Sequence, residues 1–198
     1  MPVAPDGRCR SRLTGGAGRA RRAPRFPRRR SPVPGSTFVI TIERVSWDDP
    51  RSVVLRARMD DEMHERYGSA NAGEDPAVTA ERGRALSVDP STVVTSILAL
   101  DESGEPVGHI AVRRLGDEVE LKRLIVLASA RGKGAATALL DECERVGREL
   151  GAPRLILQTG DKQPDAVALY RKTGWDQIAV YEPYAATMPW SFCFEKAL

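Results

Sequence analysis

The sequence predicts a mixed α+β domain, and three observations support this class. Segments with strand composition and segments with helical periodicity follow the order β, α, α, three β, α, β, α, β, β. Three of the strand segments are separated only by short polar turns, which indicates an antiparallel meander. No internal repeat occurs, and the 198 residues suit one domain with a tail better than two full domains.

Residues 1–36 differ in composition from the rest of the chain. They contain ten Arg, six Pro, no Lys and a single acid, Asp6, so they carry a net charge of +9. Because they have few large apolar residues to offset the entropy of ordering, we expect a disordered tail. The Arg-rich, acid-poor composition also resembles an organellar transit peptide. A start codon near Val39 and nucleic-acid contact by the tail are further alternatives, and composition leaves all of them open.

Residues 37–198 are expected to form the folded domain. This domain carries a net charge of −6, since the whole chain carries +3, so its charge gives no reason to expect nucleic-acid binding. No window approaches the roughly 20 consecutive apolar residues of a membrane helix, and we therefore expect a soluble protein without a membrane partner. The odd, sparse cysteine count fits a reducing compartment, and we expect a cytoplasmic location. Three cysteines without paired spacing and only two histidines predict no metal site.

The first part of the domain is predicted to contain one strand, two helices and the meander. Residues 38–42 are rich in β-branched side chains and predict a strand. Asp48 or Asp49 can then cap a helix that has Pro50 in its first turn. An apolar stripe on that helix recurs every fourth residue, at Leu55, Met59, Met63 and Tyr67. A second helix is predicted over 76–86, and the meander strands over 92–100, 107–115 and 118–126.

The second part is predicted to alternate between helices and short strands. A long helix spans about 134–150, because Gly151 and Pro153 end it and one face is apolar, namely Ala136, Leu139, Leu140, Cys143, Val146 and Leu150. A strand over 154–159 and a helix over 165–172 follow, and Gly174 ends that helix. Aromatic-rich strands around 178–181 and 191–195 complete the domain.

Residues 131–136, Arg-Gly-Lys-Gly-Ala-Ala, are predicted to open the long helix and to bind a pyrophosphate. A helix start leaves backbone N–H groups without partners and carries a partial positive charge. Gly132 and Gly134 let a phosphate approach those groups closely, and Arg131 and Lys133 add positive charge. The spacing matches neither the P-loop nor the dinucleotide fingerprint, and a plain strand-to-helix turn is the alternative.

Two motifs resemble those of the GNAT superfamily of N-acetyltransferases. The first resembles the superfamily's cofactor signature, Gln/Arg-x-x-Gly-x-Gly/Ala, and here reads Arg131-x-x-Gly134-x-Ala136. The second resembles the later superfamily block and here reads Gln163-x-x-Ala166-x-x-x-Tyr170-x-x-x-Gly174-Trp175. The resemblance covers roughly residues 37–198. It departs at Gln163, where the superfamily usually has Asn, and at Ala136, where Gly is commoner.

This resemblance implies a GNAT-like fold with a mixed, mostly antiparallel central sheet flanked by about four helices. It also implies acetyl-CoA as co-substrate without a metal, and acetyl transfer to a primary amine of a small-molecule or peptide acceptor in a ternary complex. The variable loops that select acceptors would be 68–77 and 182–189, and a homodimer is an option common among relatives. The implied cofactor-binding residues are Leu124, Ile125, Val126, Arg131, Gly132, Lys133, Gly134, Ala135, Ala136 and Gln163.

Two residues are candidates for catalysis by the same resemblance. Tyr170 would protonate the departing thiolate, although a tyrosine at this helical position is also typical of a core. Glu120 would act as general base for the amine, and the alternative is a strand charge paired with Lys122. Two other functions stay open, a catalytically silent acyl-CoA-binding regulatory module on the same fold and an enzyme that uses a longer acyl donor.

Overall fold

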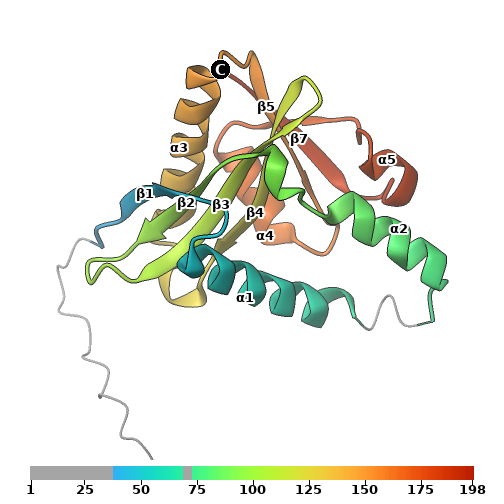
Figure 1. Ribbon diagram of the computed structural model, residues 1–198, viewed down its shortest axis with the longest axis horizontal. Helices are drawn as coiled ribbons and strands as arrows, with labels where there is room; N and C mark the ends of the chain where they lie inside the picture. Colours follow the sequence, from blue (N-terminus) through green and yellow to red (C-terminus); the bar gives the residue numbers. More distant parts are fainter. Residues whose placement is uncertain (1–37, 69–72) are drawn as a thin grey trace, which may run out of the picture. The chain divides into compact units, whose positions relative to one another are not determined.

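The computed structural model describes residues 38–68 and 73–198, which contain a single seven-stranded sheet. Its strands are β1 (Thr41–Val45), β2 (Val93–Leu100), β3 (Pro106–Leu115), β4 (Glu118–Val126), β5 (Arg154–Thr159), β6 (Asp176–Ile178) and β7 (Phe192–Ala197). Their order across the sheet is β1-β2-β3-β4-β5-β7-β6 (Figure 1). Only β4 and β5 run parallel, and all other neighbouring strands are antiparallel. The predicted mixed, mostly antiparallel α+β class is therefore confirmed. The interpretation of residues 1–36 lies outside the described residues.

Five α-helices accompany the sheet: α1 (Pro50–Tyr67), α2 (Pro76–Leu86), α3 (Ala135–Glu149), α4 (Pro164–Lys172) and α5 (Tyr184–Thr187). The start of α1 follows the predicted capping chemistry, because the Asp49 side chain accepts a hydrogen bond from the Arg51 backbone N–H at 2.8 Å. The start of α2 repeats this arrangement, with Asp75 accepting from the Ala77 N–H at 2.7 Å. The expected bounds of α2 are thus confirmed.

Alternation along β2 assigns the helices to the two faces of the sheet. Ile97 packs in the main core cluster with Leu139 of α3, whereas the next residue, Leu98, packs with Leu55 of α1. Because successive strand residues point to opposite faces, α1 and α3 cover opposite sides of the sheet, as Figure 1 also shows. Val167 and Tyr170 of α4 belong to the same cluster as Leu139, so α4 packs on the α3 side.

Three expectations about local structure were wrong. The first strand begins at Thr41 rather than at residue 38, because its register with β2 pairs Thr41 with Leu100 and Val45 with Ser96. The strand expected over 178–181 lies earlier, at Asp176–Ile178, since Val180 and Tyr181 pack into a separate cluster with Ala85, Tyr184 and Met188. The helix α5 lies within residues 182–189, which were expected to be a loop.

Neither a membrane-spanning helix nor a metal-binding cluster occurs within residues 38–68 and 73–198. No helix there is both long enough and apolar enough to cross a membrane. The same residues contain no group of three or more His, Cys, Asp or Glu side chains that could hold a metal ion.

Candidate active site

The central feature of the site is the early separation of β4 from β5. The two strands pair only at Glu120 with Ile156 and at Leu121 with Leu157, although β4 continues to Val126. On its other side β4 pairs with β3 as far as Val126. The last residues of β4 therefore present a backbone edge toward β5 that β5 does not pair, which is the arrangement that lets an extended amide-bearing ligand add to a sheet.

A β-bulge in β4 lies at this separation. Ala111 of β3 pairs with Lys122, but His109, two residues earlier, pairs with Ile125, so β4 has one extra residue there. Arg123 in the bulge has φ 61°, in the left-handed region that non-glycine residues seldom occupy. The His109 Nδ1 lies 3.0 Å from the Arg123 carbonyl oxygen. Burial lowers the pKa of His109 to about 4, so a neutral imidazole donates this hydrogen bond and holds the bulge.

A cavity of about 440 Å³, here named the α3 cavity, covers the start of α3. Gly134 is the N-cap of α3 with φ 88° and provides no side-chain cap, so the first-turn N–H groups have no side-chain acceptor there. A Cβ atom built on Gly132 or Gly134 meets no heavy atom within 4 Å. The helix start is thus open to a ligand, and its unpartnered N–H groups favour an anion.

Most of the predicted cofactor-binding residues meet at the α3 cavity. Those that line it are Leu124, Ile125, Val126, Arg131, Gly132, Gly134, Ala135, Ala136 and Gln163. Lys133 is not among the lining residues, and its Nζ lies 4.2 Å from the ring centroid of Phe38. The positive charge that Lys133 was expected to add beside the phosphate site is therefore directed at an aromatic ring in this structure.

Arg131 lies at the cavity but is already engaged by the protein. Its Nη2 donates to both carboxylate oxygens of Glu62 in α1, at 2.9 and 2.8 Å. Its Nε donates to the Val126 carbonyl oxygen at 2.9 Å. Arg131 thereby ties the end of β4 to α1, and a ligand phosphate has to compete with Glu62 for the guanidinium.

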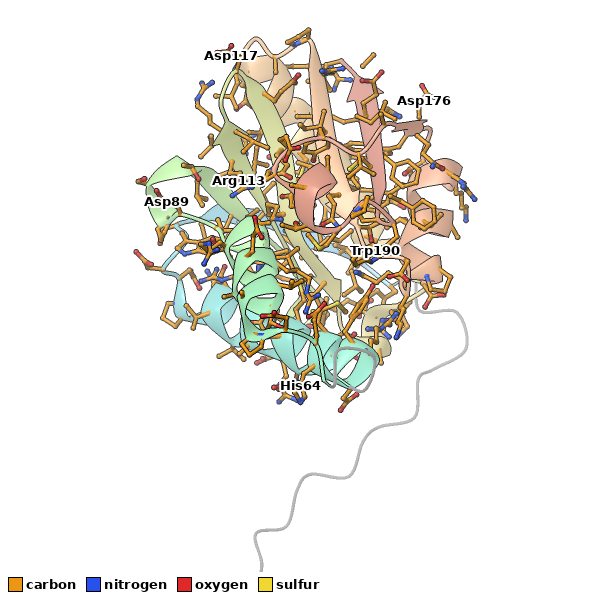
Figure 2. The ribbon with its side chains drawn as sticks, turned by 90° about the vertical axis from the view of Figure 1, so that its right-hand side faces the viewer. His64, Asp89, Arg113, Asp117, Asp176 and Trp190 are labelled. Carbon is orange, nitrogen blue, oxygen red and sulfur yellow. The ribbon has the colours of Figure 1, made fainter. Side chains whose placement is uncertain are left out.

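A second cavity of about 460 Å³, here named the α2 cavity, extends to α2 and the end of β5. Figure 2 labels two of its lining residues, His64 near the C-terminal end of α1 and Trp190 between α5 and β7. The residues that line both cavities are Met59, Met63, Leu124, Gln163 and Ala166. The two cavities are therefore contiguous around the unpaired part of β4.

Tyr170 lines the α2 cavity and also belongs to the core. Its side chain is 6% exposed, and its ring lies 5.9 Å from that of Trp175 and 5.5 Å from that of Phe194. Within the described part of the chain, no hydrogen bond is recorded for its hydroxyl. Burial raises the pKa of Tyr170, so the phenol keeps its proton at neutral pH. The two interpretations of this residue, core and proton donor, are compatible.

Glu120 lies in a buried polar cluster and not on either cavity wall. One carboxylate oxygen accepts from the Arg113 Nε at 2.6 Å, and the other accepts from the hydroxyls of Tyr181 at 2.9 Å and Tyr184 at 2.6 Å. Its side chain is fully buried, so it is not the exposed strand charge of the alternative interpretation. These contacts favour a structural role, and its role as a general base stays a prediction.

Several lining residues were not anticipated from the sequence. Arg66 and Lys172 bring positive charge to the α3 cavity, and Arg82 and Lys122 bring it to the α2 cavity. The only available signal was the apolar stripe on α1, since Met59 and Met63 line both cavities. A single Lys or Arg on a helix or strand carries no such signal, because the same residue is usual on a solvated surface.

The fold and the site define an α+β domain in which two strands of a mixed sheet separate beside a cavity at a helix start. The model of the acetyltransferase (GNAT) family matches residues 48–175. This match covers more than half of the chain, and the chain therefore belongs to the acetyltransferase (GNAT) family. The resemblance inferred from the two motifs is confirmed.

Curated relatives match over shorter segments. An IAA acetyltransferase of Azospirillum brasilense is 37% identical over 91 residues, which are 46% of this chain and 59% of the relative. An uncharacterized N-acetyltransferase of Schizosaccharomyces pombe is 33% identical over 90 residues, 44% of this chain and 53% of the relative. The chain thus spans little more than half the length of these relatives.

Solved structures agree over most of the described chain. A Klebsiella pneumoniae protein proposed to be an acyl-CoA N-acyltransferase has a TM-score of 0.62 at 25% identity, over 80% of this chain and 97% of its own. A GNAT family acetyltransferase of Elizabethkingia anophelis, solved with acetyl-CoA bound, has a TM-score of 0.55 at 16% identity, over 80% and 98%. At this level of identity the second structure establishes the shared fold alone.

Proposed function

We propose that this protein transfers an acetyl group from acetyl-CoA to a primary amine of a small-molecule or peptide acceptor, in a ternary complex. The observation that carries the proposal is the separation of β4 from β5 after Leu121, around which the α3 and α2 cavities are contiguous. One cavity has an open helix start suited to a diphosphate, and the other holds a buried phenol. Family membership and the acetyl-CoA complex of a structural neighbour support the same choice of ligand.

The start of α3 would bind the diphosphate of the co-substrate. The residues Gly132, Gly134, Ala135 and Ala136 line the α3 cavity, and their N–H groups suit a phosphate because no side chain caps this helix. No heavy atom lies within 4 Å of the Cβ position of either glycine, so phosphate oxygens can approach the backbone there. The unpaired edge of Leu124, Ile125 and Val126 would hydrogen-bond the amides of the pantetheine arm, and Gln163 would contact the same arm.

Arg131 would exchange partners when the diphosphate binds. Its present partner, Glu62, is a partly exposed carboxylate, so the ion pair between them is weak enough to be replaced. A diphosphate offers more negative charge and more acceptor oxygens than one carboxylate does. We therefore propose that Arg131 binds Glu62 and fixes the geometry of the α3 cavity before the co-substrate binds. After binding, Arg131 would contact the diphosphate instead.

The chemistry requires one bond to form and one to break. The acceptor nitrogen bonds to the thioester carbonyl carbon, the carbon–sulfur bond breaks, the amine loses a proton and the sulfur gains one. Acetyl-CoA supplies the activated acyl group, and no covalent enzyme intermediate is needed. Tyr170 would give its proton to the sulfur, since its phenol is protonated at neutral pH and lines the α2 cavity.

The test is a calorimetric titration of the full chain with acetyl-CoA, followed by an assay of free thiol release with a panel of primary amines. We expect saturable binding at one site and thiol release that depends on the amine. Absence of binding by the folded protein would contradict the proposal. Binding without turnover on any amine would favour the silent acyl-CoA-binding module. A thermal-shift series of acyl-CoAs would separate acetyl preference from preference for a longer acyl chain.

A further inference from the structure

Lys122 connects the α2 cavity with the buried polar cluster around Glu120. It follows Leu121, the last β4 residue paired with β5, so it lies where the two strands separate. Its side chain is 7% exposed and lines the α2 cavity. The Nζ donates a hydrogen bond of 2.8 Å to the Tyr184 hydroxyl, which in turn donates to Glu120 at 2.6 Å. An ammonium group has three donors, so two remain after this contact.

The cluster that Lys122 belongs to contains more cations than carboxylates. Arg113, labelled in Figure 2, and Lys122 are both nine-tenths buried or more. Glu120 is the buried carboxylate of the cluster, and it contacts Arg113 directly but reaches Lys122 only through the Tyr184 hydroxyl. Both oxygens of Glu120 are engaged by Arg113, Tyr181 and Tyr184. Throughout residues 38–68 and 73–198, no carboxylate oxygen lies within 4.0 Å of the Lys122 Nζ. The buried ammonium of Lys122 therefore has no carboxylate in direct contact with it.

The other cations of the α2 cavity do have carboxylate partners. Arg82 donates to Glu74 at 2.6 Å through Nη1, and Arg123 forms an ion pair with Asp60. The Asp161 carboxylate also lines the cavity, and in the described part of the chain it forms no ion pair with Lys122. Burial lowers the pKa of Lys122 to about 8 even though the charge of Glu120 raises it, as expected where no carboxylate contacts the ammonium directly. A bound anion would relieve this penalty.

We propose that Lys122 binds a carboxylate of the acceptor, so that the acceptor is an amino acid whose amine is acetylated. This inference rests on the proposed acyl transfer to an amine. A carboxylate supplies the missing negative charge and accepts the free donors of the ammonium group. Lys122 lies where the strands separate, so a carboxylate bound to it would lie near the thioester that the amine attacks. This fits an amino acid, because its amine and carboxylate are close together.

The rest of the cavity wall favours an apolar side chain on this amino acid. Met59, Met63, Leu86 and Leu124 line the cavity, and Trp190, which is 55% exposed, adds an aromatic surface. Apolar and aromatic walls with a few placed polar groups are typical of sites for small organic ligands. L-Phenylalanine and L-leucine are therefore suitable first acceptors.

The test compares amines that differ only in the carboxylate, L-phenylalanine with 2-phenylethylamine and L-leucine with isopentylamine, at saturating acetyl-CoA. The variants are Lys122→Met, which removes the charge, and Lys122→Arg, which keeps the charge but cannot act as a base at neutral pH. The control is Lys196→Met, because the Lys196 Nζ also donates to a neutral oxygen, that of Thr173 at 2.7 Å, and lines neither cavity. Unlike Lys122, Lys196 has a carboxylate partner, Glu144 at 3.7 Å, so this control reports the loss of a lysine outside the cavities. Calorimetry with acetyl-CoA checks that each variant keeps a folded co-substrate site.

We expect the wild type and Lys196→Met to prefer the carboxylated amine at least tenfold in kcat/KM. Lys122→Met should abolish this preference by raising KM for the amino acid at least tenfold, with unchanged acetyl-CoA affinity, and Lys122→Arg should retain most of it. Equal use of both amines by the wild type would overturn the inference. A fall in kcat on both amines in Lys122→Arg would also overturn it, because that result indicates a proton-transfer role.

A binding experiment separates failure of this inference from failure of the proposed function. With CoA present, N-acetyl-L-phenylalanine should raise the melting temperature of the wild type more than N-acetyl-2-phenylethylamine does, and the difference should vanish in Lys122→Met. This difference does not depend on turnover. If no amine is acetylated but the difference is present, acyl transfer fails and the carboxylate site stands. If the two ligands act alike, the carboxylate site is refuted whatever the turnover.

Discussion

The two cavities beside β4 share five lining residues, but the parts of their walls that they do not share come from different segments and offer different atoms. At the α3 cavity, one short segment at the start of α3 provides two glycines at positive φ and a helix start without a side-chain cap. At the α2 cavity, side chains come from α1, α2, β4, the end of β5 and α4. A backbone site needs a particular local conformation, whereas a side-chain site needs distant elements to assemble correctly.

This difference explains why one cavity can be recognised from the sequence and the other cannot. Glycines at fixed spacing before a helix are required if backbone N–H groups are to bind phosphate, so the requirement is visible as a motif. No comparable spacing links Lys122 to Arg82 or Trp190. If the two cavities differ in this way, substitutions at the α3 cavity should change co-substrate binding. Substitutions around the α2 cavity should change catalysis, acceptor choice or stability.

The largest effect is expected from Gly132→Glu. The substitution places a carboxylate at a lining position of the α3 cavity, where it would repel and displace the diphosphate. We expect the Kd for acetyl-CoA to rise by at least about a thousandfold, or about 4 kcal/mol, in a calorimetric titration. Gly132 has φ 74°, so backbone strain is expected as well.

A matched control isolates the charge effect from the strain. Gly104, in the turn between β2 and β3, has φ 81° and open space around its Cβ position, as Gly132 does. Gly104→Glu should lose a similar amount of stability, about 1 kcal/mol, but bind acetyl-CoA as the wild type does. Unchanged affinity in Gly132→Glu, or equal loss in both variants, would remove the diphosphate site from the start of α3.

The next effect concerns the buried cluster behind the α2 cavity. Glu120→Gln removes the buried carboxylate that pairs with Arg113 and that lies next to Lys122 through Tyr184, so the cluster keeps two buried cations and no anion. We expect a loss of about 3 kcal/mol in the free energy of unfolding, measured by denaturant titration. Glu118→Gln on the same strand is the control, because Glu118 pairs with Arg154 at a partly exposed site and should contribute under about 1 kcal/mol.

This variant also decides between the two roles of Glu120. A general base that acts only in catalysis can be replaced by Gln with little change in stability and a large fall in kcat. A structural carboxylate gives the opposite result, namely a large loss of stability, with an effect on kcat that follows the folded fraction. A stable Glu120→Gln protein with strongly reduced kcat would therefore restore the base assignment.

The sequence predicted the elements of the fold better than their exact limits. The capping residue Asp49, the meander and the helix α3 are determined by local chemistry and are present as expected. The limits of β1 and β6 were wrong because pairing with β2 and packing against α2 and α5 decide them, and neither is visible in the local sequence. Tertiary contacts override local preference in such segments.

In the candidate site too, the parts that belong to local motifs could be predicted, and the parts that depend on tertiary contacts could not. The glycines and Gln163 belong to motifs, and they line the α3 cavity. The bulge at Arg123 was not predicted, since a positive φ at an arginine has no sequence signal. The surroundings of Glu120 and Lys133 differ from expectation because Tyr181 and Tyr184, which bond Glu120, and Phe38, which contacts Lys133, are distant in sequence.

A somewhat smaller effect is expected from Tyr170→Phe. Phenylalanine keeps the ring that packs against Trp175 and Phe194 but cannot give a proton to sulfur. We expect kcat to fall about a hundredfold while the Kd for acetyl-CoA and the melting temperature stay nearly unchanged. Steady-state kinetics and calorimetry on the same preparation check this. If kcat is unaltered, Tyr170 is a core residue only, and the α2 cavity has a different proton donor.

The smallest effect concerns the β-bulge in β4, beside which the two cavities meet, and it depends on pH. Burial holds the pKa of His109 at about 4, below the ordinary value of about 6.5, so the folded state keeps the neutral ring while the unfolded state takes up a proton. Stability contributed by His109 is therefore complete above pH about 6.5 and is lost as the pH falls toward 4.

His109→Gln isolates this contribution, because Gln does not titrate and its amide can donate to the Arg123 carbonyl oxygen that His109 now binds. Between pH 7 and pH 5 the wild type should lose about 2 kcal/mol more stability than the variant. Parallel pH curves for the two proteins would mean that the imidazole protonates freely. The β-bulge would then depend on backbone pairing alone and not on the His109 side chain. In that respect it would resemble the start of α3, which is also formed by the backbone.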